Sequence, residues 1–125
     1  MVDVTPIIPA DRQVIDSYGP GQFRISGIIH TGPMLVFPDH VEDWPAASLT
    51  DVSVETLRPV IDAEPKVEIL LLGTGAKMGL LPSRVRQEIR AAGIVVDVMD
   101  TGAACRTYNV LLSEARRVAA ALLPV

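Results

Sequence analysis

The stretch 66-KVEILLLGTGAKMGLLPSRVRQEIRAAGIVVDVMD-100 decides the fold class of this 125-residue chain. Its first part, Lys66 to Leu72, is a nearly continuous apolar run of the kind that is buried on both faces of a parallel sheet. A glycine loop follows, and Pro82 then suits the first position of a helix that ends before Gly93. Ile94 to Met99 is a second strand, so the stretch predicts a β-α-β unit with parallel strands.

Upstream of this unit the sequence predicts an antiparallel meander. Runs rich in β-branched or aromatic residues, separated by glycine and proline turns, occupy Val14 to Tyr18, Gln22 to Ile25, Gly27 to Thr31 and Met34 to Phe37. The connection 39–51 has no lasting period and room for one short strand. Ser53 can then cap a helix over about 54–63, which Pro59 must kink or delay.

Downstream of Asp100 the sequence predicts a long C-terminal helix. Stepping 100° per residue from Ala103 gathers apolar side chains on one face as far as Leu122. The fold class is therefore α/β: a three-layer single domain with a mixed central sheet, the β-α-β unit at 66–99, the N-terminal meander and this helix. We expect a flexible arm at 1–12 and the domain at 13–125.

Composition narrows the function classes. Eleven basic against fifteen acidic residues give a net charge of −4, which argues against nucleic-acid binding. The chain has no signal-peptide pattern and no apolar run near the ~20 residues that span a bilayer. A single cysteine excludes an intramolecular disulfide and suits a reducing compartment. We expect a cytoplasmic protein with no cofactor and no metal.

The glycine loop is the first candidate site, because ligands in open α/β sheets bind at the carboxyl ends of strands. Its residues Gly73, Thr74, Gly75 and Lys77 match neither a phosphate-binding P-loop nor a dinucleotide fingerprint. Two interpretations stay open. The glycines serve a tight turn, or the loop amides and Lys77 hold a small anion such as a carboxylate or phosphate.

The entrance of the last helix is the second candidate site. Thr101 or Asp100 can cap the helix, and Arg106, Thr107 and Asn109 follow within its first turns. Helical projection places Cys105 and Asn109 on one flank, where they can share the rim of a pocket. Cys105 is a candidate nucleophile if its pKa is depressed, and otherwise an inert buried thiol.

The region around Trp44 is a third candidate. Trp44 either anchors a protein partner or packs against the core beneath the long connection. The neighbouring cluster Asp39-His40-Val41-Glu42-Asp43 lacks the spacing of a zinc site and reads as a solvated acidic loop.

Several of these residues carry a family resemblance. They are strand-Gly73-Thr74-Gly75, Leu81-Pro82, Gly93-Ile94, Met99-Asp100-Thr101 with Ala104, Thr107-Tyr108-Asn109, Leu111-Leu112 and Glu114-Ala115-Arg116. The pattern resembles a small family of uncharacterised proteins that includes the mitochondrial complex I assembly factor 3 and an adipogenesis-associated protein. The resemblance covers about residues 13–124 and is most specific over 66–124.

The resemblance implies a three-layer α/β fold with a mixed central sheet and an added antiparallel portion. It brings no catalytic residues, and it implies a binding protein, since the mitochondrial member acts with a partner assembly factor to help build an NADH:quinone oxidoreductase. Ala115 departs from the pattern, because the family has a glycine in a Glu-Gly-Arg run. We expect this departure to alter helix packing.

The residues and the resemblance together favour a non-enzymatic protein-interaction or assembly module with an unidentified protein partner. The alternative is a small-molecule binding protein or an enzyme that uses the glycine loop and the Cys105/Asn109 region for an anionic metabolite. The apolar composition also leaves a homo-oligomer possible.

Overall fold

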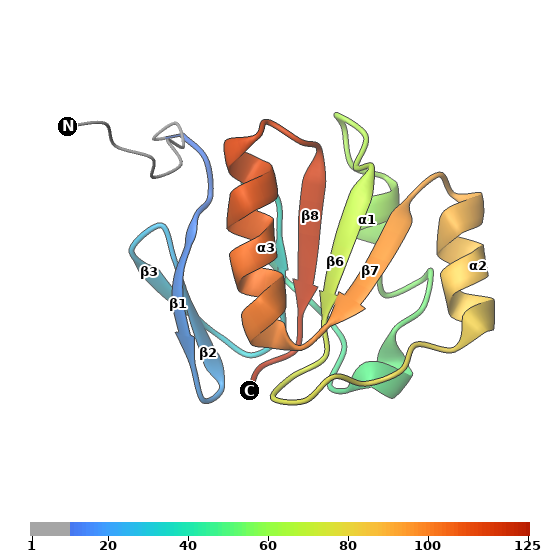
Figure 1. Cartoon of the computed structure of the whole chain (residues 1–125), viewed down its shortest axis with the longest axis horizontal. Coiled ribbons are helices and arrows are strands. Elements are labelled where there is room, and N and C mark those ends of the chain that lie inside the picture. The colour runs from blue at the N-terminus through green and yellow to red at the C-terminus, as the bar shows by residue number, and fades with distance from the viewer. Residues whose placement is uncertain (1–10) are drawn as a thin grey trace.

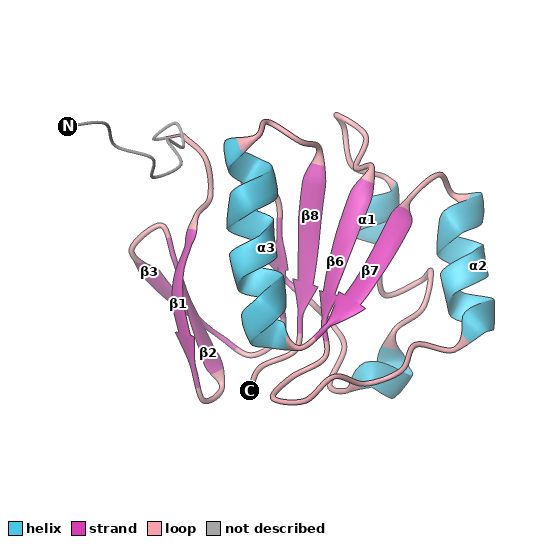
Figure 2. Cartoon of the chain, in the orientation of Figure 1, coloured by secondary structure: helices cyan, strands magenta, loops and turns pink. Residues whose placement is uncertain are grey.

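A mixed five-stranded sheet forms the centre of the molecule (Figures 1 and 2). The structure is a computed structural model that describes residues 11–125, so the predicted arm lies almost wholly outside the described residues. The strand order is β5 (Val41–Asp43), β4 (Met34–Val36), β8 (Val118–Leu122), β6 (Ile69–Gly73) and β7 (Val95–Met99). β6 runs parallel to β7 and β8, whereas β4 is antiparallel to β5 and β8. With α2 (Ser83–Ala91) between β6 and β7, the predicted β-α-β unit is confirmed.

The predicted meander is divided between two sheets. β1 (Ile15–Gly19), β2 (Gln22–Ile25) and β3 (Ile28–Thr31) form a separate antiparallel sheet, whereas β4 belongs to the central one. Burial explains the division, because all three residues of β4 are buried while β3 is largely exposed. A strand that is apolar on both faces needs a sheet covered on both sides. The turn at Gly32, with φ of 83°, leads the chain from one sheet into the other.

Two apolar layers flank the central sheet. On one face, α3 (Thr101–Ser113) and the small sheet pack through residues such as Phe23, Met34, Tyr108 and Leu122. On the other, α1 (Arg58–Ile61), α2 and the connection around the short 3-10 helix Leu49–Asp51 cover Leu70 and its neighbours. The three-layer expectation is confirmed. Among the described residues, no helix has the length and apolar character needed to cross a membrane.

The expectation of a helix as far as Leu122 is wrong. α3 ends at Ser113, and β8 then lies between β4 and β6 with all five of its residues buried. Its side chains alternate between the two apolar layers: Val118, Ala120 and Leu122 face α3, and Ala119 and Ala121 face the other layer. Alanine favours helices, but burial on both faces of the sheet outweighs that preference.

Ala115 marks the point where the helix stops. Its φ is 59°, and the bonds from Ala115 N to Leu112 O and from Arg116 N to Leu111 O form a Schellman motif. α2 ends in the same way at Gly93, whose φ is 90°. The glycine that the resemblance implies at this position would therefore suit a left-handed backbone after the helix, rather than affect helix packing.

Pro59 and Pro82 each stand at the start of a helix. α1 begins at Arg58, so the expected helix over 54–63 has the late start that Pro59 allows. Pro82 is the N-cap of α2 rather than its first helical residue.

Candidate functional site

Thr101 joins three segments at the carboxyl ends of β6, β7 and β8. Its side chain is fully buried, accepts a hydrogen bond from Gly75 N at 2.8 Å and donates one to Leu123 O at 2.6 Å. Its backbone N–H donates to Gly75 O at 2.9 Å, and Leu123 N donates to Gly73 O at 3.0 Å. We call this set of bonds the Thr101 network. It ties the glycine loop, the start of α3 and the C-terminal tail together.

Gly73 is required by this network. A Cβ at position 73 would lie 2.9 Å from Thr101 Oγ1 and 3.0 Å from Thr101 Cα, closer than atoms normally approach. At Gly75, with φ of 100°, the Cβ would meet Pro124 O at 3.5 Å. The glycines thus allow close backbone approach and a left-handed turn, as the first interpretation of the loop predicts.

Three of the six amides of the loop 74–79 donate hydrogen bonds within the protein. Thr74 N donates to Met99 O at 2.9 Å, Gly75 N to Thr101 Oγ1, and Gly79 N to Thr74 Oγ1 at 3.0 Å. At the start of α3, Asp100 Oδ1 accepts from Ala103 N at 2.9 Å, which confirms the predicted cap. Within residues 11–125, the amides of Ala76, Lys77 and Met78 at the exposed tip of the loop donate to no protein acceptor. The interpretation of the loop as a small-anion site therefore stays a prediction.

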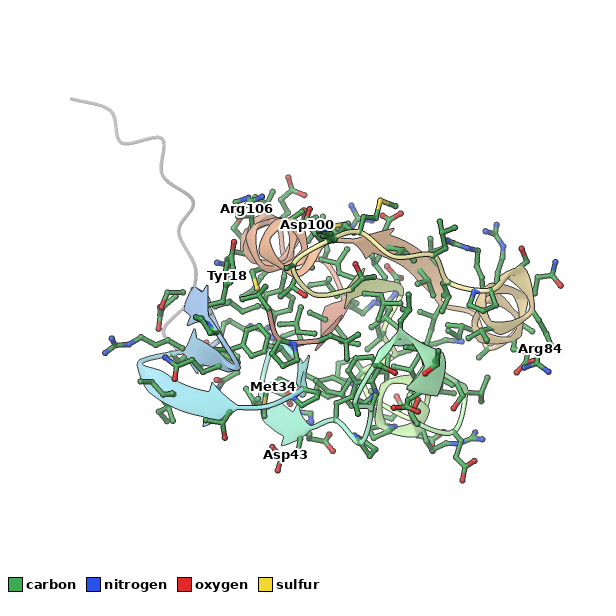
Figure 3. The ribbon with its side chains drawn as sticks, turned by 90° about the horizontal axis from the view of Figure 1, so that it is seen from below. Tyr18, Met34, Asp43, Arg84, Asp100 and Arg106 are labelled. Atoms are coloured by element: carbon green, nitrogen blue, oxygen red, sulfur yellow. The ribbon has the colours of Figure 1, made fainter. Side chains whose placement is uncertain are left out.

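Exposed side chains surround the closed network. Within the loop, Lys77 is exposed and Met78 and Leu80 are 65% and 86% exposed. On the other side of the α3 entrance lie Tyr18 and Arg106, which Figure 3 shows near Asp100 in a view from the carboxyl ends of the strands. Tyr18 and Arg106 both approach Gly102, the second residue of α3. We call Tyr18, Lys77, Met78, Leu80 and Arg106 the carboxyl-end surface.

A cavity of about 160 Å³ lies between β1 and α3. Cys105, Arg106 and Asn109 line it together with β1, so Cys105 and Asn109 share a rim as their helical spacing predicts. Asn109 is occupied, because Oδ1 accepts from Ile15 N at 3.0 Å and Nδ2 donates to Ile15 O at 2.8 Å. Its amide thereby joins the small sheet to α3. The glycine loop does not line this cavity.

Cys105 is placed as an inert thiol. The residue is 4% exposed, and burial raises its pKa to about 12, although the charge of Arg106 acts in the opposite direction. A nucleophilic cysteine needs a depressed pKa, so the geometry argues against Cys105 as a catalytic residue. Thr107, on the same helix, is half-buried.

Trp44 packs in the core beneath the connection. It is 3% exposed, and its Nε1 donates to Thr56 O at 3.0 Å. Of the two interpretations of Trp44, the structure supports core packing, and a ring so buried offers no surface to anchor a partner.

A second cavity lies at the opposite end of the strands. It has a volume of about 510 Å³ and is formed by the β4–β5 turn, the α1–β6 loop, the α3–β8 turn and Arg12. We call it the amino-end cleft. Its polar lining residues are Arg12, Asp39, His40, Glu42, Asp62, Glu64, Lys66, Ser113, Arg116 and Arg117. These residues are scattered along the sequence in turns, so no sequence motif points to them.

His40 is held between two carboxylates at this cleft. Nδ1 lies 2.6 Å from Asp39 Oδ1, Nε2 lies 2.9 Å from Glu42 Oε2, and the ring stacks on Phe37 at 4.3 Å. Burial opposes the charged imidazolium, but the two hydrogen bonds outweigh it and raise the pKa of His40. The hydrogen bond from His40 lowers the pKa of Asp39. The acidic loop is therefore more ordered than the sequence suggested.

Comparisons with known proteins agree with this architecture. Assembly factor 3 of NADH dehydrogenase (ubiquinone) 1 alpha subcomplex from Danio rerio is 45% identical over 111 residues, covering 89% of this chain and 64% of its own length. An uncharacterised protein from Rhodobacter capsulatus is 40% identical over 111 residues, covering 89% of this chain and 84% of its own. A crystal structure of a Bordetella parapertussis protein has a TM-score of 0.83 and 33% identity, covering 91% of this chain and 97% of that one.

The family model supplies the assignment. A model described as "Protein of unknown function (DUF498/DUF598)" matches residues 15–123, which include every strand and helix of the fold. The family resemblance predicted from the glycine loop and α3 is confirmed. This chain belongs to the DUF498/DUF598 family.

Proposed function

We propose that this chain is a non-enzymatic assembly module that binds a protein partner during the building of a respiratory NADH dehydrogenase complex. The likeness to assembly factor 3 supports the part of the proposal that concerns assembly of NADH dehydrogenase. The observation that carries the binding role is the arrangement at the carboxyl end of the sheet. There the Thr101 network fills the space in front of the strands, and Met78 and Leu80 are exposed beside it.

The carboxyl-end surface has the chemistry of a protein contact. Met78 and Leu80 supply exposed apolar area beside the cation of Lys77, and Tyr18 and Arg106 flank the start of α3. Methionine, tyrosine and arginine are enriched in the cores of protein interfaces. Exposed apolar side chains in a loop that is fixed at its base bind a partner with little loss of conformational entropy.

The test is affinity capture by the tagged full chain from cells that make the respiratory complex. We expect recovery of subunits or other assembly proteins of NADH dehydrogenase. The double variant Met78→Ser/Leu80→Ser and the single variant Lys77→Glu should each lower this recovery about tenfold or more. Val110→Ser is the control, because Val110 is 49% exposed on α3 outside the carboxyl-end surface.

Two outcomes would overturn the proposal. In one, no component of the respiratory complex is recovered by the parent chain. In the other, the carboxyl-end variants and Val110→Ser recover it equally, which would remove the proposed surface.

The enzyme alternative has a separate test in the reactivity of Cys105. Burial raises the pKa of Cys105 to about 12, so very little thiolate is present at pH 8, and the side chain is buried as well. We expect iodoacetamide to modify the folded chain far more slowly than the chain in denaturant. Equal modification rates in the two states would revive Cys105 as a nucleophile.

Self-association is a second candidate, favoured by strand β3. Ile28 and Ile29 are 63% and 56% exposed on this edge strand, which leaves an apolar edge open to pairing. Sedimentation of the parent chain and of Ile29→Lys would test it: a dimer that Ile29→Lys converts to monomer supports association through β3, and a monomeric parent chain excludes it.

A further inference from the structure

Strand β3 forms an open edge of the small sheet. β2 pairs with β3 on one side, and within residues 11–125 no strand pairs with its other side. The buried residues beneath this sheet include members of β1 and β2 but none of β3, so β3 extends beyond the core. Its Ile28 and Ile29 are exposed, and the strand has no lysine, proline or acidic residue of the kind that guards edge strands.

The register of the β2–β3 hairpin determines which main-chain groups face the open edge. In an antiparallel pair, residues that bond to the partner strand alternate with residues whose N–H and C=O groups point away from it. Gly32 N donates to Gly21 O at 2.9 Å, so Gly32 bonds toward the β2 side, and so does His30 two residues before it. The N–H and C=O groups of Ile29 and Thr31 therefore point to the open edge.

We propose that two copies of this chain pair through β3 in antiparallel orientation, with the two-fold axis at His30. This register places Ile29 of each copy opposite Thr31 of the other, so the open N–H and C=O groups of both residues gain partners. With the axis at Ile29 instead, Thr31 would lie opposite Gly27 in the hairpin turn. With the axis at Thr31, Ile29 would lie opposite Pro33, which has no N–H group.

The side chains of β3 suit a second copy on both faces of the sheet. On the outer face, Ile29 lies opposite Thr31 of the second copy, and such β-branched pairs stabilise antiparallel sheets. On the inner face, Ile28 lies opposite Gly32, which leaves room for the isoleucine. β3 has no aspartate, glutamate, lysine or arginine, so no permanent like charges meet across the axis. The inference rests on self-association, the second candidate of the proposed function, and adds the pairing strand and its register.

Disulfide cross-linking of the full chain tests the register. At the axis, residue 30 faces itself in a non-hydrogen-bonded pair with Cα atoms about 4.5 Å apart, a separation that a disulfide can span. In a Cys105→Ala background, His30→Cys should therefore form a covalent dimer when diamide is added. Ile28→Cys is the matched control, because residue 28 is exposed on the same strand but lies about 13 Å along the strand from its copy. Its cross-linking should be slower by about tenfold or more.

Two variants at Thr31 test the open N–H group by sedimentation equilibrium. Thr31→Pro removes a donor that bonds to nothing in the single chain, so it should keep the melting temperature and weaken dimerisation about tenfold. Thr31→Val keeps the donor and should change dimerisation less than about twofold. A dimer that cross-links equally at positions 28 and 30, or that Thr31→Pro leaves unchanged, would overturn the β3 register but not self-association. A parent chain that stays monomeric at millimolar concentration would overturn both.

Discussion

The two ends of the central sheet differ in how their polar groups are used. At the carboxyl end, the Thr101 network pairs backbone groups of Gly73 and Gly75 with Thr101 and Leu123, and the C-terminal tail runs beside the glycine loop. At the amino end, side chains from four segments surround an open cleft whose lining holds four basic and four acidic residues besides His40. At the end where open α/β sheets usually bind ligands, the Thr101 network occupies the space in front of the strands, and the larger of the two described cavities lies at the other end.

The C-terminal tail explains this difference. β8 brings the chain to the carboxyl end in the middle of the sheet, so Leu123 and Pro124 emerge next to the glycine loop. Val125 O also accepts from Gly21 N in the β1–β2 turn. A loop position that is open in other sheets is thus filled by backbone from the same chain. The position of a loop in the topology alone does not predict a site.

The largest expected effect comes from breaking the Thr101 network. Thr101→Val leaves the buried Gly75 N–H and Leu123 C=O without partners, and we expect a loss of about 2–4 kcal/mol in the free energy of unfolding. Urea denaturation measures it. Thr101→Ser retains the hydroxyl and should lose much less, and Thr107→Val is a control on the same helix. If Thr101→Val and Thr101→Ser are equally stable, the Thr101 hydroxyl does not stabilise the carboxyl end of the sheet.

A smaller change in the free energy of unfolding is expected at the C-terminal ends of α2 and α3, which lie at the amino end of the sheet. Ala115→Gly should raise the free energy of unfolding by about 0.5–1 kcal/mol, because a left-handed backbone strains alanine but not glycine. Gly93→Ala, at the matching position of α2, should lower it by about 1 kcal/mol. Thermal and urea unfolding would measure both changes. A destabilised Ala115→Gly would show that the turn gains more from the stiffer residue than it loses to strain.

The smallest effect is a pH dependence confined to the amino end. Because the pKa of His40 is raised, its stabilising contribution is complete below its ordinary value of 6.5 and is lost as the pH rises through the raised value. The side chain is 46% exposed, so we expect less than about 0.5 kcal/mol. His40→Asn should remove this slope in the unfolding free energy measured from pH 6 upward, whereas His30→Asn should keep it. An unchanged slope in His40→Asn would show that another titratable group causes the pH dependence.

The sequence predicts those elements of the fold whose conformation depends on residues close together in the chain. The β-α-β unit, the strands of the small sheet and the cap at Asp100 follow from local pattern, and each is present. β8 could not be predicted in this way, since three consecutive alanines favour a helix and only their burial between β4 and β6 makes them a strand.

The candidate sites show the same limit. Gly73, Gly75 and Thr101 are prominent in the sequence, but the bonds of Gly73 and Thr101 to Leu123 and of Gly75 to Thr101 join residues 22 or more positions apart. The amino-end cleft depends on turns from distant parts of the chain, and a pattern within one segment cannot reveal it. Cys105 and Asn109 line one cavity, as their helical spacing predicts, because one helix carries both.

Native-state hydrogen exchange at the Gly75 amide tests the closure of the carboxyl end most directly. The hydrogen bond to the buried Thr101 hydroxyl predicts slow exchange of this amide in the parent chain and exchange faster by at least about tenfold in Thr101→Val. A Gly75 amide that exchanges in the parent chain as fast as an exposed loop amide would contradict the account, since the glycine loop would then be open to a ligand.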